Sequence, residues 1–439
     1  MSIKHKIKSI LKEKGALGFA KFIFIRITSK IAAIPISFGI LCVNPFIRIR
    51  LIKLFSSRIG HYSFNTEAIM CGLALNLDDD KKQKTFFYIP PGSTICNTQL
   101  HTMWKRTLSI IPASMIASEV DKLLQKVGHK KYRNDAIKKT FEPGGDGRDR
   151  WGLLKKINKC HLSFTAEEHQ KAKILMNKLG IPDGSSFVCL LVRDSHYLNS
   201  YIPSGNWSYH DYRDADVNAY QKAAQYLADK GYYVIRMGKI VKEPFNAAHP
   251  NIIDYAVSEW RSDFLDVYLA AHCFFFLSTC TGLDSVARVF RKPLLVTNLG
   301  LPDFDIWHPW NLFIPKKMMD IKNDRIISFK EMNQLYQAMS KKQTIMSVLK
   351  EKNLRFIDNT QDEIADVVQE MLDKLENACQ YSEDDEKLQE MFWNIFPRYL
   401  VNPNLPVLKI PVNERIEMRV GNAFLKQNKF LLSDHSNFS

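Results

Sequence analysis

The stretch HCFFFLSTCTGLDSVARVFRKPLLVTNL, residues 272–299, predicts a strand, a turn, a helix and a second strand. Cys273 to Leu277 is a short uninterrupted apolar run, which is typical of a strand buried on both faces of a parallel sheet. Apolar residues then recur at helical spacing until Pro293 ends the helix, and Leu294 to Thr297 forms the next strand. This alternation predicts an α/β fold.

The turn at the centre of this stretch combines hydroxyl groups with a glycine: Ser278, Thr279, Thr281 and Gly282. At the carboxyl end of a buried strand, free backbone N–H groups and the dipole of the following helix favour a bound anion such as a phosphate. An ordinary strand-to-helix turn capped by Ser or Thr has the same composition. The turn alone does not separate the two interpretations.

The composition predicts a folded protein of two domains with reduced cysteines. A chain of 439 residues can bury two cores, and 46% hydrophobic with 24% charged residues excludes a disordered chain. None of the eight cysteines forms a CxxC pair, and several lie in apolar runs. Buried, reduced thiols in a cytosolic compartment are therefore expected, without a zinc site.

The net charge of +15 is concentrated at the N-terminus. Residues 1–53 hold eleven Lys or Arg against the single acid Glu13, which is +10 of the total. A nucleic-acid enzyme more often carries its basic residues on the folded body, so no nucleic-acid partner is expected.

Residues 1–57 are expected to form a basic amphipathic segment that lies on the anionic inner face of the cell membrane. No charge occurs between Ile31 and Ile47, but Pro35 and Pro45 are expected to interrupt this stretch. It is also short for a spanning helix, which needs about 20 apolar residues. Packing on the protein's own core and a single membrane span are the alternatives.

Residues 58–175 are expected to form an N-terminal Rossmann-like domain that binds the acceptor. A strand is predicted at Thr85–Ile89 and a helix at Asn97–Thr107. His61, next to Gly60, could place an imidazole near an acceptor hydroxyl, although a lone histidine is more often structural. The glycine-rich stretch at 142–150 is either a linker or a lid on the acceptor side.

Residues 176–350 are expected to form a second domain with a doubly wound parallel sheet. Further strands are predicted at 187–192, 232–235 and 252–255, and the charged residues Arg193, Arg236 and Asp254 stand at their carboxyl ends. Ligands of such sheets bind outside the carboxyl ends of the strands. Two arginines that converge with the Ser278–Gly282 turn are suited to a diphosphate.

Residues 351–439 are expected to form a helical extension that packs back on the two domains, with helices at 359–375 and 383–392. Asp214-Ala215-Asp216 has the spacing of a metal-binding DxD motif. It stands at a predicted helix start, where aspartates cap the helix, and capping is favoured over a metal site.

Seven motifs occur in this order along the chain: Phe164–Glu168, Tyr209–Arg213, Arg236–Gly238, Arg261–Phe264, Ser278–Gly282, Asn359–Ile364 and Arg419–Leu425. Together they resemble a family of bacterial glycosyltransferases encoded with surface-polysaccharide genes. The resemblance covers nearly the whole chain, and the set of motifs is fairly specific.

More broadly, the layout is similar to the GT-B architecture, which implies two Rossmann-like domains with the nucleotide sugar in the second. Cys280 and Ser285 stand where the heptosyltransferase group has Asp and His, so the donor contacts of that group do not carry over. Val286 stands where retaining GT-B enzymes often have a ribose-binding Glu, which leaves the stereochemistry open and makes Asp284 a substitute. Arg193 resembles the strand-end arginine of fucosyltransferase-like members.

These observations predict a metal-independent glycosyltransferase that transfers a sugar from a nucleotide-sugar donor to a cell-surface glycan or lipid-linked acceptor, without a cofactor. Arg193 would help to neutralise the leaving phosphate, and His61 or an acidic residue that faces the cleft would serve as base if the enzyme inverts. The expected donor-binding residues are Arg193, Arg236, Gly238, Asp254, Ser278, Thr279, Thr281, Gly282 and Asp284.

Two alternatives stay open. A sugar-nucleotide epimerase uses the same architecture, and a non-catalytic, membrane-bound assembly protein would explain the departures at Cys280, Ser285 and Val286. A nicotinamide enzyme is not expected, because no GxGxxG motif follows a predicted strand.

Overall fold

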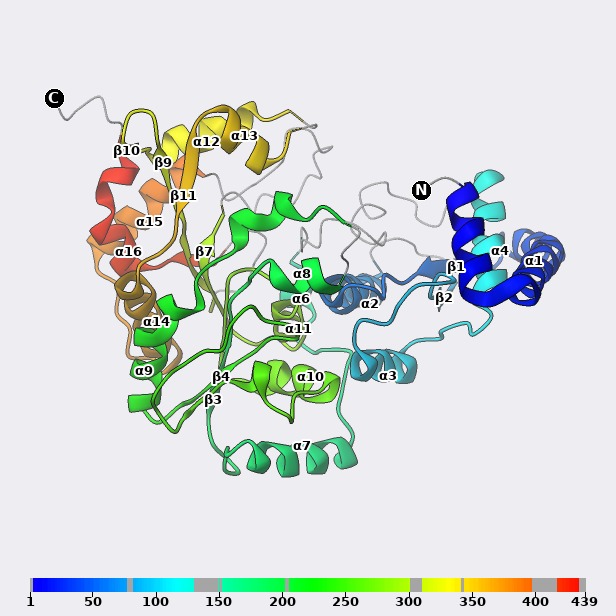
Figure 1. Cartoon of the computed structure of the whole chain (residues 1–439), viewed down its shortest axis with the longest axis horizontal. Helices are drawn as coiled ribbons and strands as arrows, with labels where there is room; N and C mark the ends of the chain where they lie inside the picture. Colours follow the sequence, from blue (N-terminus) through cyan, green and yellow to red (C-terminus); the bar gives the residue numbers. More distant parts are fainter. Residues whose placement is uncertain are drawn as a thin grey trace. The chain divides into compact units, whose positions relative to one another are not determined.

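The computed structural model describes residues 3–76, 82–129, 149, 152–201, 205–300, 310–340, 343–396 and 417–433, with the side chains of 3–14, 198 and 201 left out. The chain divides into two compact units, one of residues 1–96 with 101–146 and one of residues 97–100 with 147–439 (Figure 1). Residues 147–175, predicted as part of the first domain, belong to the second unit. Except for Asp149, the predicted linker or lid at 142–150 lies outside the described residues.

The first unit begins with the long helix α1 (Ile3–Val43), which bends at Gly15. The expectation that Pro35 interrupts this segment is wrong, because the helix continues through Pro35 to Val43. Ala33 and Ile40, on either side of the proline, are buried against α4 (Ser114–Lys126), and this packing holds the helix across the missing hydrogen bond.

The sheet of the first unit is small. Strand β1 (Arg48–Lys53) pairs in parallel with β2 (Gln83–Tyr88), and Ile110 forms a single bridge to Phe87. Helices α2 (Thr66–Ala74) and α3 (Thr98–Thr107) follow β1 and β2, and the π-helical turn His61–Asn65 leads into α2. Two predictions are corrected within the described residues. Part of the predicted membrane segment 1–57 is the strand β1, which belongs to the sheet of the first unit. That sheet has only two strands, so it is smaller than the sheet of a Rossmann-like domain.

The second unit contains a seven-stranded parallel sheet in the order β12-β8-β7-β6-β3-β4-β5. Without β12 this is the doubly wound order 3-2-1-4-5-6. The strand order reverses between β3 and β6, which are parallel to each other. The predicted doubly wound sheet is confirmed, although β8 and β12 were not predicted. The strands are β3 (Phe187–Leu191), β4 (Tyr233–Arg236), β5 (Ile252–Ile253), β6 (Phe276–Ser278), β7 (Leu294–Leu299), β8 (Leu312–Pro315) and β12 (Arg419–Val420).

Helices cover this sheet and one another. Helix α9 (Gln221–Asp229) packs on α14 (Gln361–Leu375), while α10 (Asp263–His272) packs on α11 (Asp284–Val289) and α7 (Ala166–Lys178). The predicted capping box of α7 is confirmed, because Thr165 accepts from the N–H of Glu168 and the Glu168 carboxylate accepts from the N–H of Thr165.

The C-terminal region completes the second unit. A three-stranded antiparallel sheet, ordered β10-β9-β11, is formed by Lys317–Asp320 (β9), Arg325–Ile326 (β10) and Leu354–Ile357 (β11). The remaining helices are α6 (Leu153–Lys156), α8 (His196–Tyr201), α12 (Phe329–Ala338), α13 (Ile345–Glu351), α15 (Glu383–Ile395) and α16 (Asn422–Gln427). Because β12 extends the large sheet, this region is part of the second unit's core.

Candidate active site

The carboxyl ends of β3 and β6 meet at the point where the strand order reverses, which is where doubly wound sheets bind their ligands. Here the backbone N–H of Arg193 donates a 2.9 Å hydrogen bond to the Thr279 hydroxyl, and the N–H of Thr279 bonds to the carbonyl of Leu191. The structure therefore brings together two of the predicted site segments, the one after β3 and the turn after β6.

The turn after β6 satisfies its own amides. The buried carboxylate of Asp284 accepts from the Ser278 hydroxyl and from the N–H of Thr281, both at 2.7 Å. The N–H of Cys280 donates to the Ser278 hydroxyl at 3.1 Å, and Cys280 has a positive φ of 61°. The prediction of bare amides is wrong at these two positions, and Asp284, predicted to contact the ribose or base, is engaged in holding the turn.

The side chain of Arg193 is 10% exposed and its guanidinium contacts the carboxylate of Asp214 through Nη1. Its other terminal nitrogen, Nη2, is buried and has no hydrogen-bond partner among the described residues. Burial, together with the nearby charge of Arg213, lowers the pKa of Arg193 to about 10. At neutral pH the side chain is therefore a desolvated cation, the form that binds phosphate most strongly.

Two further cations lie near Asp214: Arg213, the last residue of the Tyr209–Arg213 motif, and Lys316, which the sequence did not single out. Lys316, at the end of β8 and 3% exposed, donates 2.7 Å hydrogen bonds to the carbonyl of Asp214 and to the carboxylate of Asp358. Burial lowers the pKa of Lys316, and the charge of Arg193 acts in the same direction. Arg213 contacts Nδ1 of His210. We call Arg193, Arg213, Asp214 and Lys316 the Asp214 cluster.

The acids near this cluster limit its positive charge. Asp211 and Asp194 both raise the pKa of Arg193 by their negative charge. Asp194 also binds the backbone of the 242 loop, through a 3.1 Å hydrogen bond from the N–H of Lys242. The site is thus a balanced ionic cluster in which an incoming anion competes with protein carboxylates.

Arg236 has other partners than Arg193, and the convergence of the two arginines on one diphosphate stays a prediction. The side chain of Arg236 is 1% exposed, and its two terminal nitrogens donate to the Asp254 carboxylate and the Glu243 carbonyl, both at 3.1 Å. Asp254 also accepts from the N–H of Phe245 at 2.7 Å, so both predicted donor-binding residues are used to hold the 243–254 segment.

The glycine after Arg236 has a packing role. A Cβ on Gly238 would lie 2.5 Å from a methyl carbon of Val241 and 3.1 Å from the Cβ of Ala256. A larger residue at position 238 would clash with these side chains, and the donor-binding role of Gly238 stays a prediction. Gly282 is exposed on the turn, and its donor role stays a prediction.

His61 lies in the first unit, half-buried, with its ring against Phe55 at a centroid distance of 4.9 Å. Its role as base stays a prediction. His101, which the sequence did not single out, lies in the same unit with Nδ1 2.8 Å from the Tyr62 hydroxyl. Burial lowers the pKa of His101, so its ring is neutral near pH 7 and can accept a proton.

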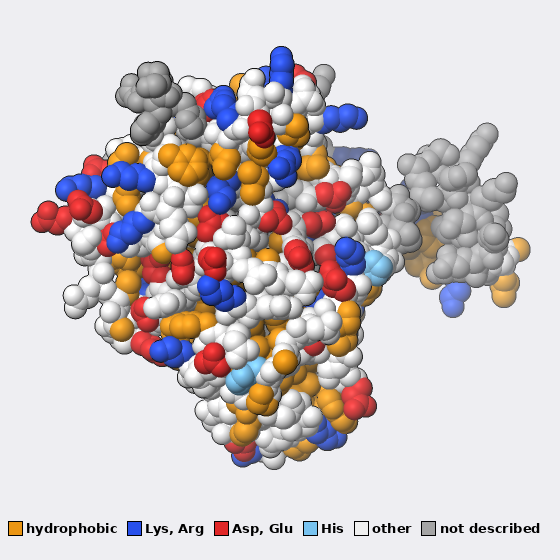
Figure 2. All heavy atoms as spheres, turned by 60° about the vertical axis from the view of Figure 1, so that its left-hand side comes forward, with side chains coloured by type: hydrophobic (Ala, Val, Ile, Leu, Met, Phe, Trp, Pro, Cys, Tyr) orange, Lys and Arg blue, Asp and Glu red, His pale blue; other side chains and the backbone are white. Residues whose placement is uncertain are grey.

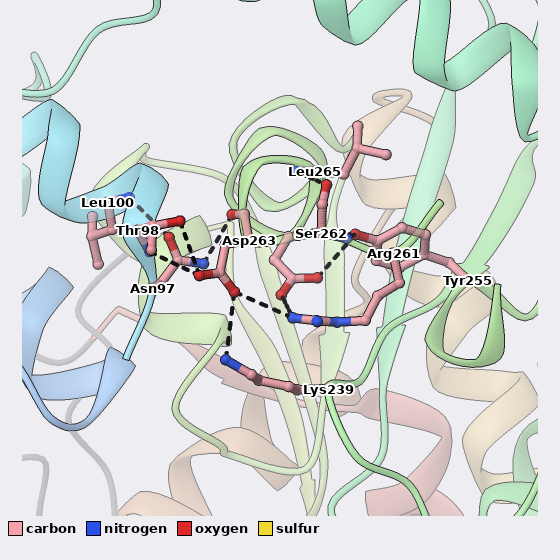
Figure 3. A network of polar contacts seen from close by, with 10 residues as sticks. Asn97, Thr98, Leu100, Lys239, Tyr255, Arg261, Ser262, Asp263 and Leu265 are labelled. Carbon is pink, nitrogen blue, oxygen red and sulfur yellow. Dashed lines mark hydrogen bonds and ion pairs between the residues drawn. The ribbon is translucent and has the colours of Figure 1, made fainter. Parts of the chain in front are cut away.

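The motif Arg261–Phe264 forms a second polar network at the start of α10 (Figure 3). Asp263 accepts from the N–H and hydroxyl of Thr98, at 2.8 and 3.1 Å, and Lys239 and Arg261 lie 3.5 Å away. Arg261 also contacts Asp266, which accepts a 3.0 Å hydrogen bond from the Tyr255 hydroxyl. These contacts attach residues 97–100 to the second unit, so this motif is structural.

The DxD spacing is likewise explained by the fold. Asp216 accepts from the N–H of Asn218 at 2.9 Å and caps the 3-10 helix Val217–Tyr220, whereas Asp214 contacts Arg193. The predicted capping role is confirmed for Asp216.

No protein-family model matches this chain, and no curated protein matches it. Among solved structures it is similar to a glycosyl transferase family 9 protein from Veillonella parvula, with a TM-score of 0.39, 9% identity, and coverage of 74% of this chain and 97% of the other. It is also similar to the ADP-heptose LPS heptosyltransferase II of E. coli, with a TM-score of 0.29, 12% identity, and coverage of 56% and 83%.

A third similar structure is TibC from enterotoxigenic E. coli, described as an iron-containing dodecameric glycosyltransferase, with a TM-score of 0.33, 12% identity, and coverage of 76% of each chain. All three are glycosyltransferases. Their TM-scores lie below 0.5, so substrate and mechanism have to be inferred from the residues of this chain.

Proposed function

We propose that this protein is a glycosyltransferase that uses a nucleotide-sugar donor and a cell-surface glycan or lipid-linked acceptor. The observation that carries the proposal is the buried Nη2 of Arg193, which has no acceptor among the described residues and stands at the reversal point of a doubly wound sheet. A guanidinium in this position is suited to an oxygen of a phosphate or diphosphate.

The donor phosphate would exchange with the carboxylate of Asp214. Because Lys316 holds the backbone carbonyl of Asp214, the side chain of Asp214 can move aside while the loop stays in place. Arg193 would then face the phosphate oxygens, and its charge would stabilise the negative charge that develops on the leaving group. The polar partners of Thr279 and Asp284 keep the turn beneath it rigid.

We further propose that the transfer needs no metal. The two carboxylates with metal-binding spacing, Asp214 and Asp216, are engaged by an arginine and by a helix N-terminus. Cationic side chains can stabilise a leaving diphosphate in place of a divalent ion. His61 is the proposed base if the enzyme inverts, and Nδ1 or Nε2 of its ring would take the proton of the acceptor hydroxyl.

Calorimetric titration of the full chain with UDP, GDP, ADP and CMP tests this proposal. We expect one of the four to bind, and Arg193→Ala to weaken that binding about 10- to 100-fold, because a charge-assisted hydrogen bond to a buried group contributes about 1.5 to 3 kcal/mol. Arg325→Ala is the matched control, since Arg325 is exposed and pairs with Glu331.

Two results would contradict the proposal. If none of the four nucleotides binds the wild-type chain, the non-catalytic assembly protein becomes the better explanation. If a nucleotide binds Arg193→Ala as tightly as the wild type, its phosphate does not contact Arg193. Release of an altered nucleotide sugar without an acceptor would favour the epimerase.

A further inference from the structure

Helix α1 has two opposite faces of different character. The face formed by Ser29, Ala33, Ser37 and Ile40 is buried, and Ala33 and Ile40 pack with Ala117, Val120 and Leu124 of α4. These positions recur every three or four residues, so they form one stripe along the helix. Small side chains on this stripe allow the two helices to approach closely.

The opposite face of α1 is apolar and exposed. Its members also recur every three or four residues, and each is between 36% and 69% exposed: Phe24, Ile27, Ile31, Ile34, Phe38 and Leu41. At 100° per residue the mean direction of this stripe lies about 135° away from that of the stripe that packs on α4. An exposed stripe of six large apolar side chains marks an interaction surface.

The charges on α1 indicate which partner covers this stripe. Lys21, Arg26 and Lys30 are all exposed, and residues 1–53 contain eleven cations against one acid. On the face of the protein seen in Figure 2, by contrast, basic and acidic side chains are interspersed. A cationic apolar helix is complementary to an anionic lipid surface, and a second copy of the same helix would bring like charges together.

The packing on α4 decides between a helix that spans the membrane and one that lies on it. Residues 15–43 are long and apolar enough to span, with a mean hydropathy of 1.6 in the best window. However, α4 is fixed along this part of α1 and carries Glu119, Lys122 and Lys126, of which Lys122 is 57% exposed. A spanning α1 would draw these charges into the hydrocarbon, which is strongly unfavourable.

We therefore propose that α1 lies in the plane of an anionic membrane, with the stripe from Phe24 to Leu41 inserted among the lipids and α4 covering it from the aqueous side. This surface anchors the protein without crossing the bilayer. It involves other residues than the proposed nucleotide site, so either proposal can fail alone.

The test is co-sedimentation of the full chain with vesicles of phosphatidylcholine, or of an equimolar mixture of phosphatidylcholine and phosphatidylglycerol. We expect tight binding to the anionic vesicles that weakens with salt, and at least tenfold weaker binding for the variant Phe24→Asp/Ile31→Asp/Phe38→Asp. The matched control is Val127→Asp/Ile174→Asp, which changes exposed apolar residues elsewhere. Lys21→Gln/Arg26→Gln/Lys30→Gln should reduce the salt dependence without removing an apolar contact.

Three outcomes would overturn this proposal. The first is equal vesicle binding by the wild type and the triple aspartate variant. The second is retention of the protein in membranes at alkaline pH in carbonate, which indicates a spanning helix. The third is a change of oligomeric state of the triple variant in vesicle-free solution, which would assign the stripe to a second copy. An unchanged nucleotide affinity of the triple variant confirms that its second unit is folded.

Discussion

The ends of the neighbouring strands β3 and β4 each place a buried arginine at the same edge of the sheet, and the two arginines have different surroundings. The two terminal nitrogens of Arg236 donate hydrogen bonds to the Asp254 carboxylate and the Glu243 carbonyl. Arg193 contacts the carboxylate of Asp214 and keeps one buried terminal nitrogen without a partner among the described residues. Among the described residues, Arg236 lacks a partner only at Nε, whereas Arg193 lacks one at a terminal nitrogen, Nη2, which can reach a ligand.

This difference shows that burial of a charge does not by itself identify a binding site. Asp254 neutralises Arg236 from the adjacent strand β5, and the Glu243 carbonyl completes the pairing, so the arrangement is closed within one segment. Around Arg193, the cations Arg213 and Lys316 repel it, and the pKa of Arg193 is lowered mainly by burial. The repulsion favours an anion at Arg193, whereas Arg236 needs none.

The largest expected effect is on stability, at Arg236. We expect Arg236→Met to lower the free energy of unfolding by about 3 to 5 kcal/mol, because the largely buried Asp254 carboxylate loses its cationic partner and keeps only the N–H of Phe245. Urea denaturation followed by circular dichroism measures this loss, with Arg325→Met, at an exposed pair, as the control.

The double variant Arg236→Met/Asp254→Asn sharpens this result. It removes both charges, so we expect it to recover part of the lost stability. Nucleotide affinity measured at a temperature where the single variant is folded should equal that of the wild type. A stable Arg236→Met protein with lost nucleotide affinity would reverse the assignment of the two arginines.

The same contrast shows what the sequence could predict. The strands at 187–192, 232–235 and 354–357 and the helix that follows Thr165 have local signals, namely apolar runs, turn residues and capping pairs, and the structure confirms them. The position of Arg193 beside the turn after β6 was predictable for the same reason, since both follow buried parallel strands.

What could not be predicted depends on contacts between distant segments. The choice of Asp254 as partner of Arg236 and the place of Lys316 beside Asp214, 102 residues away, have no local signal. The reciprocal bonds of Asn298 and Asn359, at 2.6 and 2.7 Å across 61 residues, are another case. They explain why the Asn359–Ile364 motif is structural: it joins α14 to the end of β7.

Lys316 gives the next largest effect. We expect Lys316→Met to cost about 1 to 3 kcal/mol of unfolding free energy, since the part-buried carbonyl of Asp214 loses its donor. Nucleotide binding should weaken as well, because the Asp214 loop is released. Lys317→Met is the matched control: Lys317 pairs with Glu363 and should lower stability alone. Equal nucleotide affinity in both variants would separate Lys316 from the site.

The smallest expected effect is the change of nucleotide affinity in Asp214→Asn, and whether binding becomes tighter or weaker tests the role of Asp214. If the carboxylate of Asp214 occupies the place of a phosphate, Asp214→Asn should bind the nucleotide about two- to fivefold more tightly than the wild type, because the partly exposed ion pair that competes with the ligand contributes less than about 1 kcal/mol. Asp254→Asn should leave that affinity unchanged and lower stability. Calorimetric titration of both variants measures the two affinities. Weaker nucleotide binding by Asp214→Asn would mean that Asp214 orients Arg193 for the ligand. Asp214 would then hold Arg193 in place as Asp254 holds Arg236.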